Sequence, residues 1–188
     1  MKRTPEYLFW NRKYHCERRK LAYERIAGEM AELRRLRTSG AETAALVAKL
    51  TELENAVALC LEHSQAAIFG LKHSMRHGTE EAGGATGRIL AEELLLQDLL
   101  EEKINAVRLL RAHAVNEEHL EAYMARLKEL KTSGSEATAA GRILNGLKKM
   151  QKAAKKEFLA LVDVHAERSA LGKDIFRRIE ELDPRSGG

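Results

Sequence analysis

Two nearly identical stretches, MAELRRLRTSG at residues 30–40 and MARLKELKTSG at residues 124–134, lie 94 positions apart in a chain of 188. Over residues 30–45 and 124–139, nine of sixteen positions are identical. Each stretch has apolar residues at helical spacing and ends in Thr-Ser-Gly, which is typical of a helix C-terminus. We interpret each as the turn of an antiparallel helical hairpin. The repeat indicates an internal duplication, and independent use of the same turn chemistry is the alternative.

Breaks in the helical periodicity divide the chain into four long segments. Besides the two Thr-Ser-Gly turns, Gly78, Gly83 and Gly84 mark a break. Rods of this length are not stable alone and must pack on each other. The predicted fold class is all-α, with two antiparallel helical hairpins forming an elongated bundle or coiled coil. The predicted helices lie near residues 5–37, 42–77, 86–131 and 136–182.

The predicted domain organisation follows the two hairpins. Residues 1–84 form a first hairpin with a basic, aromatic N-terminal helix, and residues 85–188 form a second, longer hairpin. The composition, 44% hydrophobic and 32% charged, is typical of long helices. Two cysteines are too few for a disulfide framework, and no apolar run is long enough to span a membrane. We expect a location in the cytoplasm or inside an assembled particle.

The N-terminal forty residues differ from the rest of the chain. They contain eleven Lys and Arg against five Glu, and five of the nine aromatic residues fall within the first 23 positions. A helix of this kind can neutralise phosphates with its cations and stack its rings on bases. The predicted nucleic-acid or partner-binding residues are Lys2, Arg3, Trp10, Arg12, Lys13, Tyr14, Arg18, Arg19 and Lys20.

Three other interpretations of this helix stay open. Trp, Tyr and Arg are common anchors of protein interfaces, so the helix can be a docking surface for a protein. A basic amphipathic helix can also lie on an anionic membrane. The structural alternative is that the aromatic rings pack into the bundle while the acidic start of the third helix satisfies the charges.

Charges also predict how the second hairpin pairs. Folding it about residues 133–134 places the acidic start of the third helix beside the basic end of the fourth. The acidic residues are Glu92, Glu93, Asp98, Glu101 and Glu102, and the basic residues are Arg168, Lys173, Arg177 and Arg178. A second basic face on the fourth helix is interpreted as a solvated face. It consists of Lys148, Lys149, Lys152, Lys155 and Lys156.

Metal ligands are present at suggestive spacings. Cys60 and His63 lie one helical turn apart, and the folded hairpin places His15 and Cys16 at the same level, which is a zinc-type ligand set. His73 and His77, at i and i+4, can share a metal. We favour buried core cysteines and an exposed helix end instead. We therefore predict no metal and no cofactor.

No nucleophile turn, phosphate-binding glycine loop or dinucleotide fingerprint is present in the sequence, so we predict that the protein is not an enzyme. We expect a structural or binding protein that binds an anionic partner through its N-terminal helix. In its most specific form, this hypothesis names nucleic acid as the partner. The alternatives are a helical chaperone or export adaptor that binds another protein's helix, and a metal-binding helical bundle. Long apolar stripes also favour a protein partner or self-assembly as a homo-oligomer.

Overall fold

The computed structural model describes the backbone of residues 5–77, 80–132 and 137–183, and the side chains of residues 12–77, 84–129 and 140–183. Four helices account for nearly all of these residues: α1 (Pro5–Ser39), α2 (Thr43–His77), α3 (Glu80–Thr132) and α4 (Ala137–Leu182). Within these ranges the structure contains no strand. The predicted all-α class is confirmed.

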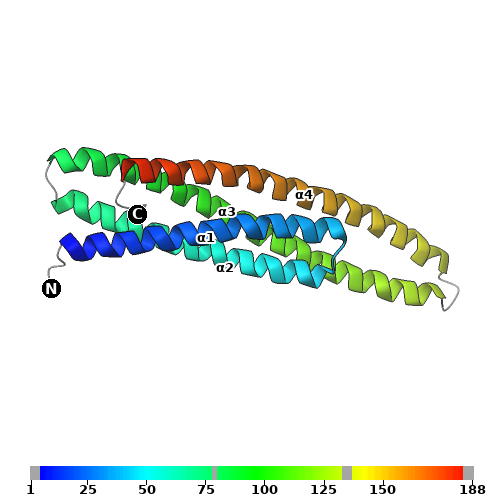
Figure 1. The fold of residues 1–188 in the computed structure, drawn as a ribbon. Helices are drawn as coiled ribbons and strands as arrows, with labels where there is room; N and C mark the ends of the chain where they lie inside the picture. Colours follow the sequence, from blue (N-terminus) through cyan, green and yellow to red (C-terminus); the bar gives the residue numbers. More distant parts are fainter. Residues whose placement is uncertain (1–4, 78–79, 133–136, 184–188) are drawn as a thin grey trace.

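The four helices form an elongated bundle (Figure 1). Each helix packs against two neighbours: α1 on α2 and α4, and α3 on α2 and α4. Consecutive helices run antiparallel, as the hairpin interpretation predicts. One apolar core runs through the bundle and takes side chains from all four helices. The two hairpins therefore bury a common core, although each is a continuous segment of the chain.

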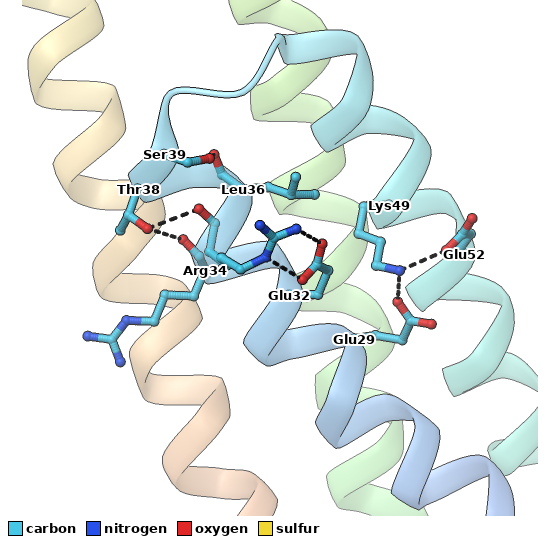
Figure 2. Close-up of polar contacts among 9 residues, drawn as sticks. Glu29, Glu32, Arg34, Leu36, Thr38, Ser39, Lys49 and Glu52 are labelled. Atoms are coloured by element: carbon cyan, nitrogen blue, oxygen red, sulfur yellow. Dashed lines mark hydrogen bonds and ion pairs between the residues drawn. The ribbon is translucent and has the colours of Figure 1, made fainter.

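The first turn is a helix C-cap built by the Thr-Ser-Gly sequence. Gly40 has a φ of 75°, a conformation that glycine adopts at little cost. The backbone N–H of Ala41 donates to Leu36 O at 3.2 Å, which satisfies a carbonyl at the end of α1. The Thr38 hydroxyl donates back to Arg34 O and to Arg35 O, both at 3.0 Å (Figure 2). The predicted turn at residues 38–40 is confirmed.

A short bridge between α1 and α2 lies just below this turn. Lys49 of α2 forms ion pairs with Glu29 of α1 and with Glu52 of α2 (Figure 2). The ion pair with Glu29 links the two helices of the hairpin. Partly exposed pairs of this kind contribute less than about 1 kcal/mol each, so they favour the register more than they stabilise the fold.

Two differences from the predicted boundaries concern α3. The predicted second Thr-Ser-Gly turn at residues 132–134 lies mostly outside the described residues, and α3 ends at Thr132 as expected. The helix begins at Glu80 rather than near residue 86, so Gly83 and Gly84 lie inside it and do not mark a break. Acidic residues in a first turn interact favourably with the helix dipole, which offsets part of the cost of the two glycines.

The second hairpin is longer than the first and extends past it (Figure 1). The side chain of Glu121 marks the level of the α1–α2 turn, because it accepts from Thr43 Oγ1 at 2.9 Å and from Gln151 Nε2 at 3.1 Å. Residues 122–132 of α3 and 137–150 of α4 continue beyond this level, and we call them the projecting arm. The arm has a small separate core of Met124, Leu127 and Leu144.

The length and polarity of the helices bear on membrane insertion. In the described part of the chain, no helix holds an apolar stretch long enough to cross a bilayer.

Candidate functional site

Carboxylates of the second hairpin pair with three of the cations predicted to bind a partner, Arg12, Arg19 and Lys20. Arg12 forms an ion pair with Asp183 at 2.6 Å, and Lys20 forms one with Glu180 at 2.6 Å. Both carboxylates belong to the C-terminal end of the chain. The second hairpin therefore supplies the carboxylate partners of these two cations.

Arg19 is enclosed by the bundle. Its side chain is 1% exposed and forms an ion pair with Glu93 of α3, which is 0% exposed. The guanidinium also lies 5.1 Å from the ring centroid of Phe176 on α4. A side chain in this position cannot contact a surface ligand. The acidic start of α3 thus satisfies this predicted binding residue, which is the structural alternative raised by the sequence.

The other predicted binding residues remain on or near the surface. Tyr14 is exposed, and the guanidinium of Arg18 lies 5.4 Å from its ring centroid. Lys13 lies 3.9 Å from Glu17 in a pair within α1. Trp10 belongs to α1, but its side chain lies outside the described residues, as do Lys2 and Arg3.

The predicted zinc-type set comes together only in part. His15 and His63 are in contact through their Nδ1 atoms at 2.9 Å. Cys16 and Cys60 are free, buried thiols on either side of Arg19: Arg19 Nη2 donates to Cys16 Sγ at 3.8 Å, and Cys60 donates to Arg19 O at 3.6 Å. No group of three or more metal-type ligands exists among the residues with described positions.

Burial of the two thiols disfavours the thiolate form that binds metal. Burial raises the pKa of Cys60 to about 12 and raises the pKa of Cys16 from its ordinary value. Metal binding requires the thiolate, so an environment that favours the neutral thiol opposes it. His73 and His77 stack with ring centroids 4.6 Å apart at the end of α2. Among the described residues, the predicted ligands thus meet as two histidine pairs.

A buried lysine in the middle of the bundle was not singled out by the sequence. Lys103 of α3 is 1% exposed. Its ammonium donates to Ser169 Oγ at 2.7 Å and to His165 O at 3.2 Å, both on α4. These acceptors are neutral, and burial lowers the pKa of Lys103 to about 8. Its position at the seven-residue spacing from the buried Leu96 and Leu110 was the available signal.

This lysine makes stability depend on pH in an unusual direction. The lowered folded pKa means that, between about pH 8 and the ordinary value of 10.5, the unfolded chain holds a proton that the folded chain has released. Stability from this group therefore rises with pH across that window and is lowest at neutral pH, where the ammonium is buried. Below about pH 8 both states are protonated, and the contribution is constant.

We expect Lys103→Met to raise the free energy of unfolding at pH 7 by about 1–2 kcal/mol, because it removes a buried charge whose acceptors are neutral. Ser169 keeps a partner, since its hydroxyl donates to His165 O at 2.9 Å. Urea unfolding at pH 7 and at pH 10 measures the effect, and the gain should shrink at the higher pH. Lys72→Met, at an exposed position, is the control. A loss of stability at pH 7 would contradict the expectation.

The unpaired cations of the described surface gather on α4. We call Lys148, Lys149, Lys152, Lys155 and Lys156 the α4 lysine run. All are exposed except the half-buried Lys155. Within the described part of the chain, none of the five forms an ion pair. The sequence-based interpretation of this face as solvated agrees with its exposure.

The α4 lysine run begins where α1 ends. Arg34 of α1 forms an ion pair with Asp163 at 3.2 Å, and Arg37 lies 5.0 Å from the ring centroid of Phe158. Lys155 and Lys148 continue the seven-residue spacing of Val162, which is buried. The side of α4 that faces α1 is therefore apolar where α1 covers it and lined with lysine beyond its last turn.

The projecting arm adds further exposed cations to this region. Arg126 and Lys128 of α3 and Arg142 of α4 are exposed and form no ion pair with any described residue. By contrast, Arg108 and Arg111, further along α3, both form ion pairs with Glu54 of α2. The exposed cations of the arm thus extend the basic region of the α4 lysine run.

Comparison of the chain with protein-family models, with curated proteins and with solved structures finds no match.

Proposed function

We propose that this chain is a non-enzymatic helical protein that binds an anionic polymer, specifically nucleic acid. We also propose that it acts as a homo-oligomer. The observation that carries the binding proposal is the α4 lysine run. Five lysines within nine residues form no ion pair with any described residue, so their charge is available for phosphates, whereas Arg12, Arg19 and Lys20 of α1 have carboxylate partners. The proposed centre of binding therefore moves from α1 to α4.

The spacing of the lysines suits a phosphate backbone. Residues 148 to 156 span about 12 Å of helix, and the arm extends the basic region further. Lysine contacts to phosphates carry no sequence information, so the proposed binding is tolerant of sequence and strongly dependent on salt. Arg18 and Tyr14, which lie together on α1, supply a smaller second contact in this proposal.

A non-enzymatic role is supported by where the buried ionisable groups lie. Arg19, Glu93 and Lys103 are enclosed between helices, away from any substrate that approaches from solvent. Each of these side chains bonds a partner on another helix, which is a packing role rather than that of a reacting centre. Free buried thiols suit a reducing compartment, so we place the protein in the cytoplasm or inside an assembled particle.

Charge reversal on α4 tests this proposal. We expect the variant with Lys148, Lys152 and Lys155 changed to Glu to bind a generic DNA or RNA at least about 100-fold more weakly at about 50 mM salt. The slope of its affinity against salt concentration should fall by the equivalent of roughly three phosphate contacts. Electrophoretic mobility and fluorescence anisotropy measure both quantities. The matched control changes Lys72, Arg88 and Lys173 to Glu, which alters net charge equally at other exposed positions.

A second triple variant separates the two ends of the molecule. Changing Lys13, Arg18 and Lys20 to Glu should weaken binding by less than about tenfold if α4 is the main site. A larger loss from this set than from the α4 set would move the site to α1, as the sequence first predicts. Absence of any binding at 50 mM salt by the unmodified protein would refute the proposal.

A second candidate function, holding a helix of another protein, is favoured by apolar side chains that remain exposed along the outside of α3 and α4. An amphipathic helix binds such a surface through residues at helical spacing. Binding of this kind would depend weakly on salt, which distinguishes it from the nucleic-acid proposal.

A further inference from the structure

The outside of the second hairpin carries a regular stripe of exposed apolar side chains. On α3 they lie fourteen residues apart, and on α4 they lie seven or fourteen residues apart. Their exposed fractions range from 46% to 64%. We call this set the outer α3–α4 stripe. It consists of Leu95, Leu109 and Tyr123 on α3, and Ile143, Met150, Val164 and Leu171 on α4.

Ion pairs show where the stripe lies. Glu102 of α3 pairs with Arg168 of α4, and Glu92 pairs with Arg178 at 2.9 Å, so these four side chains bridge the two helices at the surface. Glu102 shares its seven-residue spacing with the α3 members of the stripe, and Arg178 shares its spacing with the α4 members. Both rows therefore flank the same surface seam between α3 and α4. The opposite sides of these helices contribute to the shared core.

The apolar residues form rows across the seam. Because Glu102 lies opposite Arg168, Leu109 lies near the level of Val164, and Tyr123 lies between the levels of Met150 and Ile143. Polar rows separate these apolar rows, and Glu102 with Arg168 forms one of them. The surface thus repeats apolar and polar levels along its length. Large exposed apolar surfaces that polar residues border mark interaction sites.

We infer that the outer α3–α4 stripe is the interface at which a second copy of this chain docks. A twofold axis parallel to the helices brings each level of one hairpin onto the same level of the other, with α3 of each copy over α4 of its partner. Apolar rows then meet apolar rows. In the polar row, Glu102 of each copy faces Arg168 of the other as well as its own, so the surface is complementary to itself.

The size of the stripe suits a stable dimer. From Leu95 to Tyr123 the chain advances 28 residues, which is about 42 Å of helix. Two helices side by side are roughly 20 Å wide, so the covered face is on the order of 800 Å² per copy. This matches the area that a specific interface buries on each partner. The inference rests on the homo-oligomer part of the proposed function and does not depend on nucleic-acid binding.

Sedimentation equilibrium without nucleic acid tests the interface. We expect the unmodified protein to be a dimer at about 10 μM and the variant with Leu109, Met150 and Val164 changed to Glu to be a monomer, with dimer affinity lowered at least about 100-fold. The matched control changes Leu21, Leu59 and Phe69 to Glu, which are equally exposed but outside the stripe. It should remain a dimer. Circular dichroism verifies that both variants are helical.

Crosslinking tests the arrangement with a milder change. Leu95→Cys places one exposed thiol near the end of the stripe, and the proposed axis brings it to the level of the same residue of the partner, diagonally across the interface. A short bismaleimide should then give a covalent dimer, whereas Leu59→Cys should not. Buried Cys16 and Cys60 are poorly reactive in both variants.

Three outcomes overturn the inference. They are a monomeric unmodified protein, a stripe variant that stays dimeric, and a Leu95→Cys variant that dimerises without crosslinking. A monomer that binds a foreign amphipathic helix at the stripe would assign the surface to that partner instead. Failure of nucleic-acid binding with an intact dimer would reject only the binding proposal, because the α4 lysine run is unchanged in these variants.

Discussion

Replacing Arg19 with methionine is expected to lower the free energy of unfolding by about 3–5 kcal/mol, the largest effect of any single change considered for this chain. The reason is the partner that remains. Glu93 is fully buried on α3, and the Arg19 guanidinium is the cation that pairs with it. Without that cation, the carboxylate must stay charged in an apolar core or take up a proton, and both cost free energy.

Denaturant unfolding of a small set of variants isolates this effect. The double variant with Arg19 and Glu93 both changed to methionine should recover most of the loss, because it leaves no buried charge. The control is Lys20→Met, which breaks the more exposed ion pair with Glu180 and should cost less than about 1 kcal/mol. Equal losses from Arg19→Met and Lys20→Met would show that burial of the Arg19–Glu93 pair is energetically unimportant.

Gly172→Ala is expected to destabilise the protein by roughly 3 kcal/mol. A Cβ at this position would overlap the hydroxyl oxygen and ring carbons of Tyr23, whose side chain is buried. The ring cannot move away freely, because its hydroxyl donates to Ser169 O at 3.0 Å and its centroid lies 5.0 Å from that of the Phe176 ring. Overpacking here should exceed the gain of about 1 kcal/mol that alanine gives in a helix.

Other glycines in the bundle provide the matched controls. At Gly28 and Gly70, an added Cβ would have no neighbouring atom within 4 Å, so alanine there should stabilise the protein by about 0.5–1 kcal/mol. The penalty at Gly172 should also shrink in a Tyr23→Leu background, which removes the ring. Thermal and urea unfolding give the comparison. A stabilising Gly172→Ala would contradict the close packing of Tyr23 on α4.

Much of the fold could be predicted from the sequence because it follows from helical periodicity and turn chemistry. The Thr-Ser-Gly stretch at residues 38–40 forms the expected cap, and the expected ion pairs of Arg168 and Arg178 with the start of α3 are present. The predicted start of α3 was wrong. Two adjacent glycines end a helix only when no other interaction compensates for their cost. Glycine cost is small beside the packing of a long helix.

The candidate site was less predictable, because charge in a sequence does not specify exposure. Arg19 lies on the same heptad seam as the buried Cys16, Tyr23 and Ile26, and Glu93 lies on that of Ile89 and Leu96. That spacing already indicated burial for both. The composition of the N-terminal helix nevertheless suggested a surface, since partners from α3 and α4 are visible only in three dimensions.

The binding site proposed on α4 was hard to predict for a different reason. Its lysines were visible in the sequence, but the end of α1 determines which of them face open solvent. The level at which α1 ends along α4 depends on the relative lengths of the two hairpins and on their packing. Local sequence reports neither of these. The absence of intramolecular partners for the α4 lysine run, among the residues described, is likewise a property of the assembled bundle.

The buried charges along the bundle have a consequence for how the chain selects one alignment. Heptad repeats of Leu, Ile and Val match almost equally well when one helix slides by seven residues along another. Such a slide of α1 along α3 would carry Arg19 from Glu93 to the level of Leu100 and would also separate Arg37 from Glu117, whose ion pair is buried near the opposite end of α1. The shifted alignment would break two buried ion pairs, and each broken pair would cost several kcal/mol. The two ion pairs therefore specify the register and exclude staggered packings that the apolar repeat alone would permit.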